Sequence, residues 1–190
     1  MEGNPKANHM RIWKLIADVT NFDSVMPVDL DLGYESHTDE GKSMADDWKP
    51  IELQRAYTEE DLPMSDFPYF YGSPVMSDRA ISVLSPIMKD AVEYLQLIFD
   101  EKEYSMVNVV RVLNVIDYDK AKYVKFSNGN KILAFQKYSF RMCDELLNND
   151  IFKLVDESSR DPFVSDRFKQ TVEDNHLTGF KFELVWDSGE

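Results

Sequence analysis

The sequence predicts an α+β fold in which a mostly antiparallel sheet is flanked by a few helices. Three observations support this prediction: runs of β-branched and aromatic residues recur along the chain, an Asn-Gly turn separates two of them, and serine-capped helical patterns lie between others. Hydrophobic residues make up 43% and aromatic residues 13% of the 190 residues, which is enough to build a core. We expect a single domain over residues 10–190, preceded by a disordered lead over residues 1–9 that could be foreign to the natural chain.

The first third of the chain alternates strand patterns with irregular segments. Residues 10–19 predict one strand and residues 53–57 another. Between them, residues 18–47 carry nine acidic residues and one lysine, interrupted by proline and glycine, and indicate an extended loop with room for one short strand. Residues 59–74 combine three prolines with four aromatic residues, so we expect a loop with hydrophobic contents.

The first helix is predicted to begin at Ser77. Its hydroxyl is placed to cap the helix, and Asp78 follows in the first turn, where the helix dipole favours a negative charge. Pro86 falls inside the pattern and predicts a kink or a break. The apolar residues at helical spacing, which extend the predicted helix as far as Leu95, are Ala80, Leu84, Ile87, Met88, Ala91 and Leu95.

A β-hairpin is the firmest local prediction. Asn128-Gly129 separates two segments in which apolar and polar residues alternate, and both turn residues of such a hairpin need a positive φ. Residues 104–118, just before it, are rich in β-branched residues and predict one or two further strands.

The last forty residues predict a strand, a helix and a final strand. The strand is expected from Ile151, and the helix from a cap at Ser165 or Asp166. After a turn at Gly179, the last strand places Phe180, Phe182, Leu184 and Trp186 on one face. The residues expected in the core are Trp186, Phe182, Phe180, Leu133, Phe135, Val109, Val115, Leu84 and Ile87.

Two hexads of the form P-x-x-S-D-R, at residues 74–79 and 162–167, each precede a helical pattern. Either the fold uses the same strand-to-helix junction twice, or two ordinary caps coincide. The flanking sequences are unlike each other, so we favour a coincidence of capping chemistry over a duplication.

The charge of the chain narrows the class of partner, and its cysteine content and short apolar runs indicate the compartment. Acidic residues number 35 against 21 basic ones, and the formal net charge of -14 repels nucleic acid and anionic lipid, so neither a nucleic-acid nor a membrane partner is expected. A basic protein partner would be attracted instead, although acidity also serves solubility alone. The single cysteine, Cys143, excludes an internal disulfide, and no apolar run approaches the ~20 residues of a membrane span, so we expect a cytoplasmic protein.

No catalytic, cofactor-binding or metal-binding residues are predicted. The three histidines, His9, His37 and His176, do not stand at a ligand spacing, and His176 is expected to lie at the end of a helix. Cys143 is followed by two acidic residues that would raise its pKa, which indicates a small buried hydrophobe. A glycine-rich phosphate loop is missing from the sequence. A small hydrolase whose carboxylates come together only on folding stays open as an alternative.

The acidic stretch, residues 18–47, is the best functional candidate. Its formal charge is -8, and its carboxylates repel one another unless cationic groups lie close to them. A solvated loop and a docking surface explain it equally well. The predicted partner-binding residues are Asp29, Asp31, Tyr34, Glu35, Asp39, Glu40, Asp46 and Asp47.

Several short motifs, in this order, resemble the immunity protein eleven family of bacterial polymorphic-toxin immunity proteins. They are RIWKL at 11–15, DDWKP at 46–50, SDFP at 65–68, GSPVMSDRA at 72–80, VNVVRVLNVIDY at 107–118, KYSF at 137–140, IFKL at 151–154, VSDRF at 164–168 and LTGFKFELVW at 177–186. The resemblance implies a non-enzymatic protein that protects its producer by binding and occluding a cognate toxin, which would be basic if charge guides the encounter. It also covers relatives that regulate a neighbouring enzyme, so a regulatory subunit is the alternative. It leaves the toxin, the contact residues and the oligomeric state open.

Overall fold

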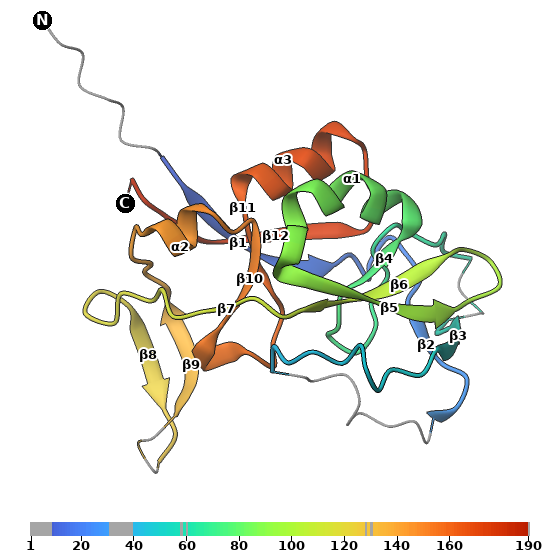
Figure 1. Cartoon of the computed structure of the whole chain (residues 1–190), viewed down its shortest axis with the longest axis horizontal. Coiled ribbons are helices and arrows are strands. Elements are labelled where there is room, and N and C mark those ends of the chain that lie inside the picture. The colour runs from blue at the N-terminus through green and yellow to red at the C-terminus, as the bar shows by residue number, and fades with distance from the viewer. Residues whose placement is uncertain are drawn as a thin grey trace, which may run out of the picture.

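The computed structural model describes residues 9–30, 40–57, 59, 61–127, 129 and 131–189. Two five-stranded sheets and a separate two-stranded hairpin form its β structure (Figure 1). Sheet one has the order β12 (Phe180–Asp187), β1 (Arg11–Ala17), β11 (Phe163–Ser165), β10 (Ile151–Leu154), β7 (Val112–Leu113). Sheet two has the order β2 (Val25–Pro27), β3 (Ile51–Arg55), β5 (Val92–Ile98), β6 (Tyr104–Val109), β4 (Val75–Ser77). The hairpin consists of β8 (Lys122–Lys125) and β9 (Ile132–Lys137).

The predicted α+β class with mainly antiparallel pairing is confirmed. Among the described strands only β3 with β5 and β7 with β10 pair in parallel. The expectation of one sheet is wrong, because the first and last strands pair with each other in sheet one while most central strands form sheet two. The helices are α1 (Asp78–Met88), α2 (Asp144–Leu147) and α3 (Asp166–Asp174).

Three groups of buried side chains form the core. The first group contains Leu15 and Val164 of sheet one and Val107 of sheet two, so it joins the two sheets, and we call it the shared core. It also contains side chains of α1 and α3, which lie side by side in Figure 1. The sheet-one core lies around Phe152, and the sheet-two core around Leu95. The loop of residues 59–74 has the expected hydrophobic contents, as Phe67 and Phe70 are 5% and 0% exposed.

The first helix ends earlier than the sequence predicts. It stops at Met88, where Lys89 has a φ of 49°, and residues up to Leu95 continue into a short 3-10 turn and strand β5. The apolar residues there satisfy two spacings at once, and pairing with β6 decides between them. Pro86 lies within the helix and does not end it.

Most of the predicted core residues lie in the core, with one clear error. Val109, Val115 and Leu84 are fully buried, and another five pack at the edges of the three cores: Ile87, Phe135, Phe180, Phe182 and Trp186. Leu133 is 41% exposed because the hairpin that carries it lies outside both large sheets. The single face predicted for the last strand is also broken. A register shift between Leu184 and Trp186 places Trp186 against the sheet-one core, whereas Phe180 and Phe182 pack against the shared core, and Leu184 is 46% exposed.

The two P-x-x-S-D-R hexads adopt the same structure, which goes beyond a coincidence of caps. Each hexad forms a short strand whose serine, Ser77 or Ser165, caps the following helix by accepting a hydrogen bond from the amide three residues on. Each serine hydroxyl also donates to a buried aspartate from an earlier segment, Asp66 at 2.7 Å or Asp150 at 2.6 Å. The serine amide donates to the carbonyl of the same aspartate in both cases. The fold therefore uses one strand-to-helix junction twice.

Candidate functional site

The acidic stretch begins directly after β1 and then forms β2, the edge strand of sheet two. Val25 follows the buried Asp23 and pairs with Arg55 of β3, which sets the register of β2. The Val28 amide then donates to the Glu52 carbonyl at 2.9 Å and continues the pairing past the end of the strand. One side of the stretch is thus fixed to the sheet as far as Val28.

The other side of the stretch is fastened to β5 and β6. Glu93 of β5 accepts hydrogen bonds from the Met44 amide at 2.5 Å, from the Ser43 hydroxyl at 2.8 Å and from the Asn108 side chain at 2.8 Å. Burial disfavours the charged form of Glu93, but these hydrogen bonds outweigh it and lower its pKa, so the carboxylate stays ionised. Trp48 adds a bond from its indole nitrogen to the Gln96 carbonyl at 2.9 Å. Residues 43–48 are therefore held on a rigid support.

Among the described residues of the stretch, Asp18 and Asp23 have cationic partners inside the protein. Asp18 pairs with Lys181 at 2.8 Å, and although burial opposes its ionisation, hydrogen bonds from Asn21, Lys181 and nearby amides lower its pKa to about 2. Asp23 accepts a hydrogen bond from the Tyr57 amide at 3.2 Å and lies 3.5 Å from Arg55. These two carboxylates stabilise the fold, so less charge faces a partner than the sequence count of -8 suggests.

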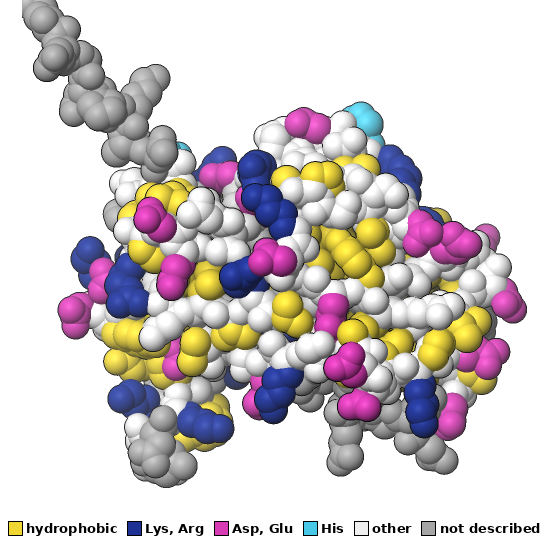
Figure 2. Space-filling view, viewed as in Figure 1, with side chains coloured by type: hydrophobic (Ala, Val, Ile, Leu, Met, Phe, Trp, Pro, Cys, Tyr) yellow, Lys and Arg dark blue, Asp and Glu magenta, His cyan; other side chains and the backbone are white. Residues whose placement is uncertain are grey.

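Four of the eight predicted partner-binding residues lie within the described part of the chain, and all four are exposed: Asp29, Glu40, Asp46 and Asp47. The other four, Asp31, Tyr34, Glu35 and Asp39, lie outside the described residues. Figure 2 shows acidic side chains gathered on the side of the molecule that carries β2, β3 and the β5–β6 turn. Leu30 and Val28 add apolar surface next to Asp29, with exposures of 64% and 46%.

Sequence reasoning missed an exposed face of sheet two beside the acidic stretch. Tyr94 and Ile98 of β5 are 41% and 46% exposed, and they alternate with Leu95 and Leu97, which enter the sheet-two core. Ile98 is the register partner of the exposed Glu52 on β3. The signal was present as the alternation of residues 92–98, but the helical interpretation of Leu95 hid it.

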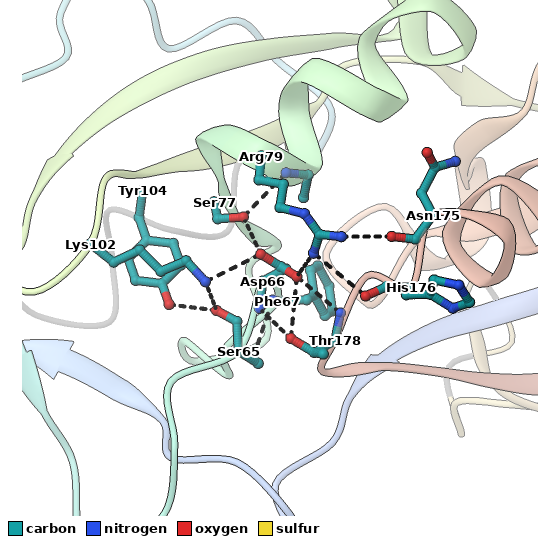
Figure 3. Close-up of polar contacts among 11 residues, drawn as sticks. Ser65, Asp66, Phe67, Ser77, Arg79, Lys102, Tyr104, Asn175, His176 and Thr178 are labelled. Atoms are coloured by element: carbon teal, nitrogen blue, oxygen red, sulfur yellow. Dashed lines mark hydrogen bonds and ion pairs between the residues drawn. The ribbon is translucent and has the colours of Figure 1, made fainter.

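A dense polar cluster lies around Asp66, where the loop of residues 59–74 meets the start of α1 (Figure 3). Its carboxylate accepts hydrogen bonds from the Ser77 hydroxyl at 2.7 Å, Arg79 at 2.9 Å, Lys102 at 3.2 Å and the Thr178 amide at 3.0 Å. Burial opposes ionisation of Asp66, but these donors prevail and lower its pKa. Such a carboxylate has no spare lone pair directed at a substrate, and a lowered pKa makes it a poor general base. The cluster is structural.

The remaining candidates for catalysis are dispersed. His9 contacts Asp187 at 2.6 Å, His176 turns the chain after α3 with a φ of 51°, and His37 lies outside the described residues. Cys143 is partly buried and packs against the sheet-one core in front of α2. The part of the chain that the structure describes contains no group of three histidine, cysteine or acidic side chains placed to hold a metal ion.

Two cavities next to the loop around Phe70 are small. One lies between β1 and the loop around Phe70, and a second lies between that loop and β6, each with a volume of about 20 Å³. That is room for about one water molecule. Within the described residues, no helix combines the length and the apolar character needed to cross a bilayer.

Comparison with known proteins gives the chain a family. No curated protein matches it. The model of the immunity protein family Imm11 matches residues 21–187, which include the acidic stretch from residue 21 onward, both strand-to-helix junctions and the last strand. Because this match covers most of the chain, the protein belongs to the Imm11 immunity protein family.

Proposed function

We propose that the protein neutralises a cognate bacterial toxin by binding it directly and occluding its working surface, in the cytoplasm of the cell that makes both. The match to the immunity family over residues 21–187 is the observation that carries this proposal. Immunity is a binding function, and it needs an exposed surface in place of a substrate cleft. The site that meets the toxin therefore lies on the exposed surface.

The acidic stretch and the neighbouring face of sheet two supply a suitable surface. Glu40, Asp46 and Asp47 are exposed on a segment that Glu93 fastens to β5, so little conformational entropy is lost when a partner binds there. Tyr94 and Ile98 offer apolar anchors beside these charges. Charge and apolar surface together are typical of a protein-binding site.

The net charge of -14 favours a basic toxin. Long-range attraction between opposite charges speeds the first encounter, and this matters for a protein that must reach its toxin before the toxin acts. The proposal therefore predicts an association rate that falls steeply as salt is added.

The test is to purify the protein with the product of the neighbouring gene and to follow both complex formation and protection of the cell. Protection should be stoichiometric, with full inhibition of the toxin at one equivalent, because occlusion involves no turnover. A protein that destroyed the toxin enzymatically would protect at much smaller amounts. Absence of a complex, together with unrelieved toxicity on co-expression, would refute the proposal.

A charge-matched pair of variants locates the surface. The first combines Glu40→Gln, Asp46→Asn and Asp47→Asn, and the second changes three exposed acids elsewhere: Asp119→Asn, Glu145→Gln and Glu183→Gln. Both raise the formal net charge from -14 to -11. The first should slow association at low salt by about tenfold, and the second should leave it close to wild type.

A further inference from the structure

The hairpin of β8 and β9 has the opposite charge to the rest of the protein. Residues 120–137 contain five lysines and no acidic residue, so this segment has a formal charge of +5. The rest of the chain carries -19, which gives the net charge of -14. In Figure 1 this hairpin projects from the lower left of the molecule, and in Figure 2 basic and hydrophobic side chains meet there. Its two strands are paired with each other and belong to neither five-stranded sheet.

Aromatic contacts attach the base of the hairpin to the protein body. Tyr123 and Phe135 face each other across the two strands with ring centroids 5.9 Å apart, and Phe135 stacks on Tyr138 at 4.9 Å. Tyr138 is buried in the sheet-one core and donates to Glu157 at 2.7 Å. Arg160 donates to the Leu133 carbonyl at 2.9 Å and ties β9 to the body from its side. The hairpin is thus an arm with a fixed base.

The outer part of the arm combines unpaired positive charge with exposed apolar side chains. Four of its lysines, Lys122, Lys125, Lys131 and Lys137, are exposed, and no described carboxylate forms an ion pair with them. The fifth, Lys120, pairs with Asp117 at 3.2 Å. Three hydrophobic residues are also exposed along the arm: Val124 at 41%, Phe126 at 46% and Leu133 at 41%. Cationic and apolar groups on a preformed support resemble a protein interface more than a solvated loop.

We propose that the β8–β9 hairpin is a second docking arm, which binds an acidic protein surface on the same toxin that the acidic stretch engages. This inference rests on the proposed function, because that function supplies the partner. Phe126 would anchor the contact, and the lysines around it would pair with carboxylates of the partner.

The charge distribution favours a protein over a polyanion as the ligand of the arm. A six-residue strand such as β9 is only about 20 Å long. Nucleic acid or an anionic bilayer presents negative charge over a much larger area, which would also face the acidic bulk of the molecule and be repelled. An acidic patch of limited size on a protein avoids this repulsion.

The experiment compares two triple variants with the same net charge. The arm variant combines Lys122→Gln, Lys125→Gln and Lys131→Gln, and the control variant combines Lys49→Gln, Lys89→Gln and Arg141→Gln, three exposed cations outside the arm and the acidic stretch. Both have a formal charge of -17, so any general effect of added negative charge is equal. We expect the arm variant to bind the purified product of the neighbouring gene about tenfold more weakly and with a shallower salt dependence, and the control to bind as wild type or more tightly.

Phe126→Ala separates apolar contact from charge. This side chain lies outside the three cores, so thermal unfolding should stay near the wild-type temperature while the toxin dissociates about tenfold faster. If wild type binds the toxin and the arm variants bind equally well, the arm is not a contact and only this inference fails. If wild type does not bind the toxin, the proposed function fails and the inference with it. Binding of the arm to duplex DNA or to anionic phosphatidylserine vesicles, with no loss of toxin affinity in the arm variants, would also overturn it.

Discussion

The two strand-to-helix junctions share a capping serine, a buried aspartate and an arginine, but the aspartates connect different numbers of segments. Among the described residues, the Asp150 side chain bonds within its own junction, to Ser165 and Arg167. Asp66 also bonds to Lys102 after β5 and to Thr178 before β12, and so joins four parts of the chain. The same local sequence can therefore have a local role in one place and a global role in another, depending on what packs against it.

The largest expected effect comes from Asp66→Asn. The amide keeps the size of the side chain but removes its charge, which leaves Arg79 and Lys102 without their buried partner. Breaking a buried ion pair costs ~3–5 kcal/mol, and because these two cations are partly exposed we expect about 3 kcal/mol less stability. Urea unfolding at neutral pH measures the change. A loss below about 1 kcal/mol would show that the contacts of Asp66 do not hold these four parts of the chain together.

Asp150→Asn should cost less, about 1 to 2 kcal/mol, because the lost charge and acceptor oxygen face only Ser165 and one largely exposed arginine. The same unfolding experiment applies. Ser77→Ala and Ser165→Ala are the matched controls, since each removes one cap and one hydrogen bond to its aspartate. Equal losses for the two alanine variants, with unequal losses for the two asparagine variants, would assign the difference to the aspartates. Equal losses of stability for the two asparagine variants would contradict a different role for the two aspartates.

The smallest effect is a change in acid sensitivity. Hydrogen bonds and Lys102 lower the folded-state pKa of Asp66 below the unfolded value of about 3.9, so its contribution is complete above that pH and disappears as the pH falls through the folded-state pKa. Asp66→Asn has no such group, so its stability should fall less than that of wild type between pH 5 and pH 3. Urea midpoints across this range test the difference. Parallel pH profiles for the two proteins would contradict the ionised state that we assign.

The sequence predicted elements whose signals are local. The hairpin of β8 and β9, the serine cap of α3 and the last strand all depend on neighbours within a few residues, and all three are present. In the turn of the hairpin Gly129 has the expected positive φ, 73°, and Asn128 lies outside the described residues. Strand β5 was predicted as helix because its apolar residues fit both spacings, and only its partner β6 distinguishes them. Leu133 looked like a core residue because a hairpin pattern does not reveal whether a third strand lies beside it.

The repeated junction shows a different limit. The hexads were visible, but the aspartates that complete them lie 11 and 15 residues before the serines, so no single spacing reveals the likeness. The candidate site was predictable only in part for a similar reason. Asp29, Glu40, Asp46 and Asp47 are exposed as an acidic loop suggests, whereas Asp18 and Asp23 found cationic partners that are distant in the sequence.

The pairing of β1 with β12 has a consequence for synthesis. Strand β1 leaves the ribosome long before residues 180–187, which form one of its two neighbours in sheet one, so the pairing of β1 stays incomplete until those residues have been made. A nascent chain stopped before residue 180 would display the edge of β1 and the apolar side chains that Phe180 and Phe182 normally meet, which marks it for aggregation or proteolysis. Quality control by the cell thus favours copies in which β12 has been made and is paired with β1.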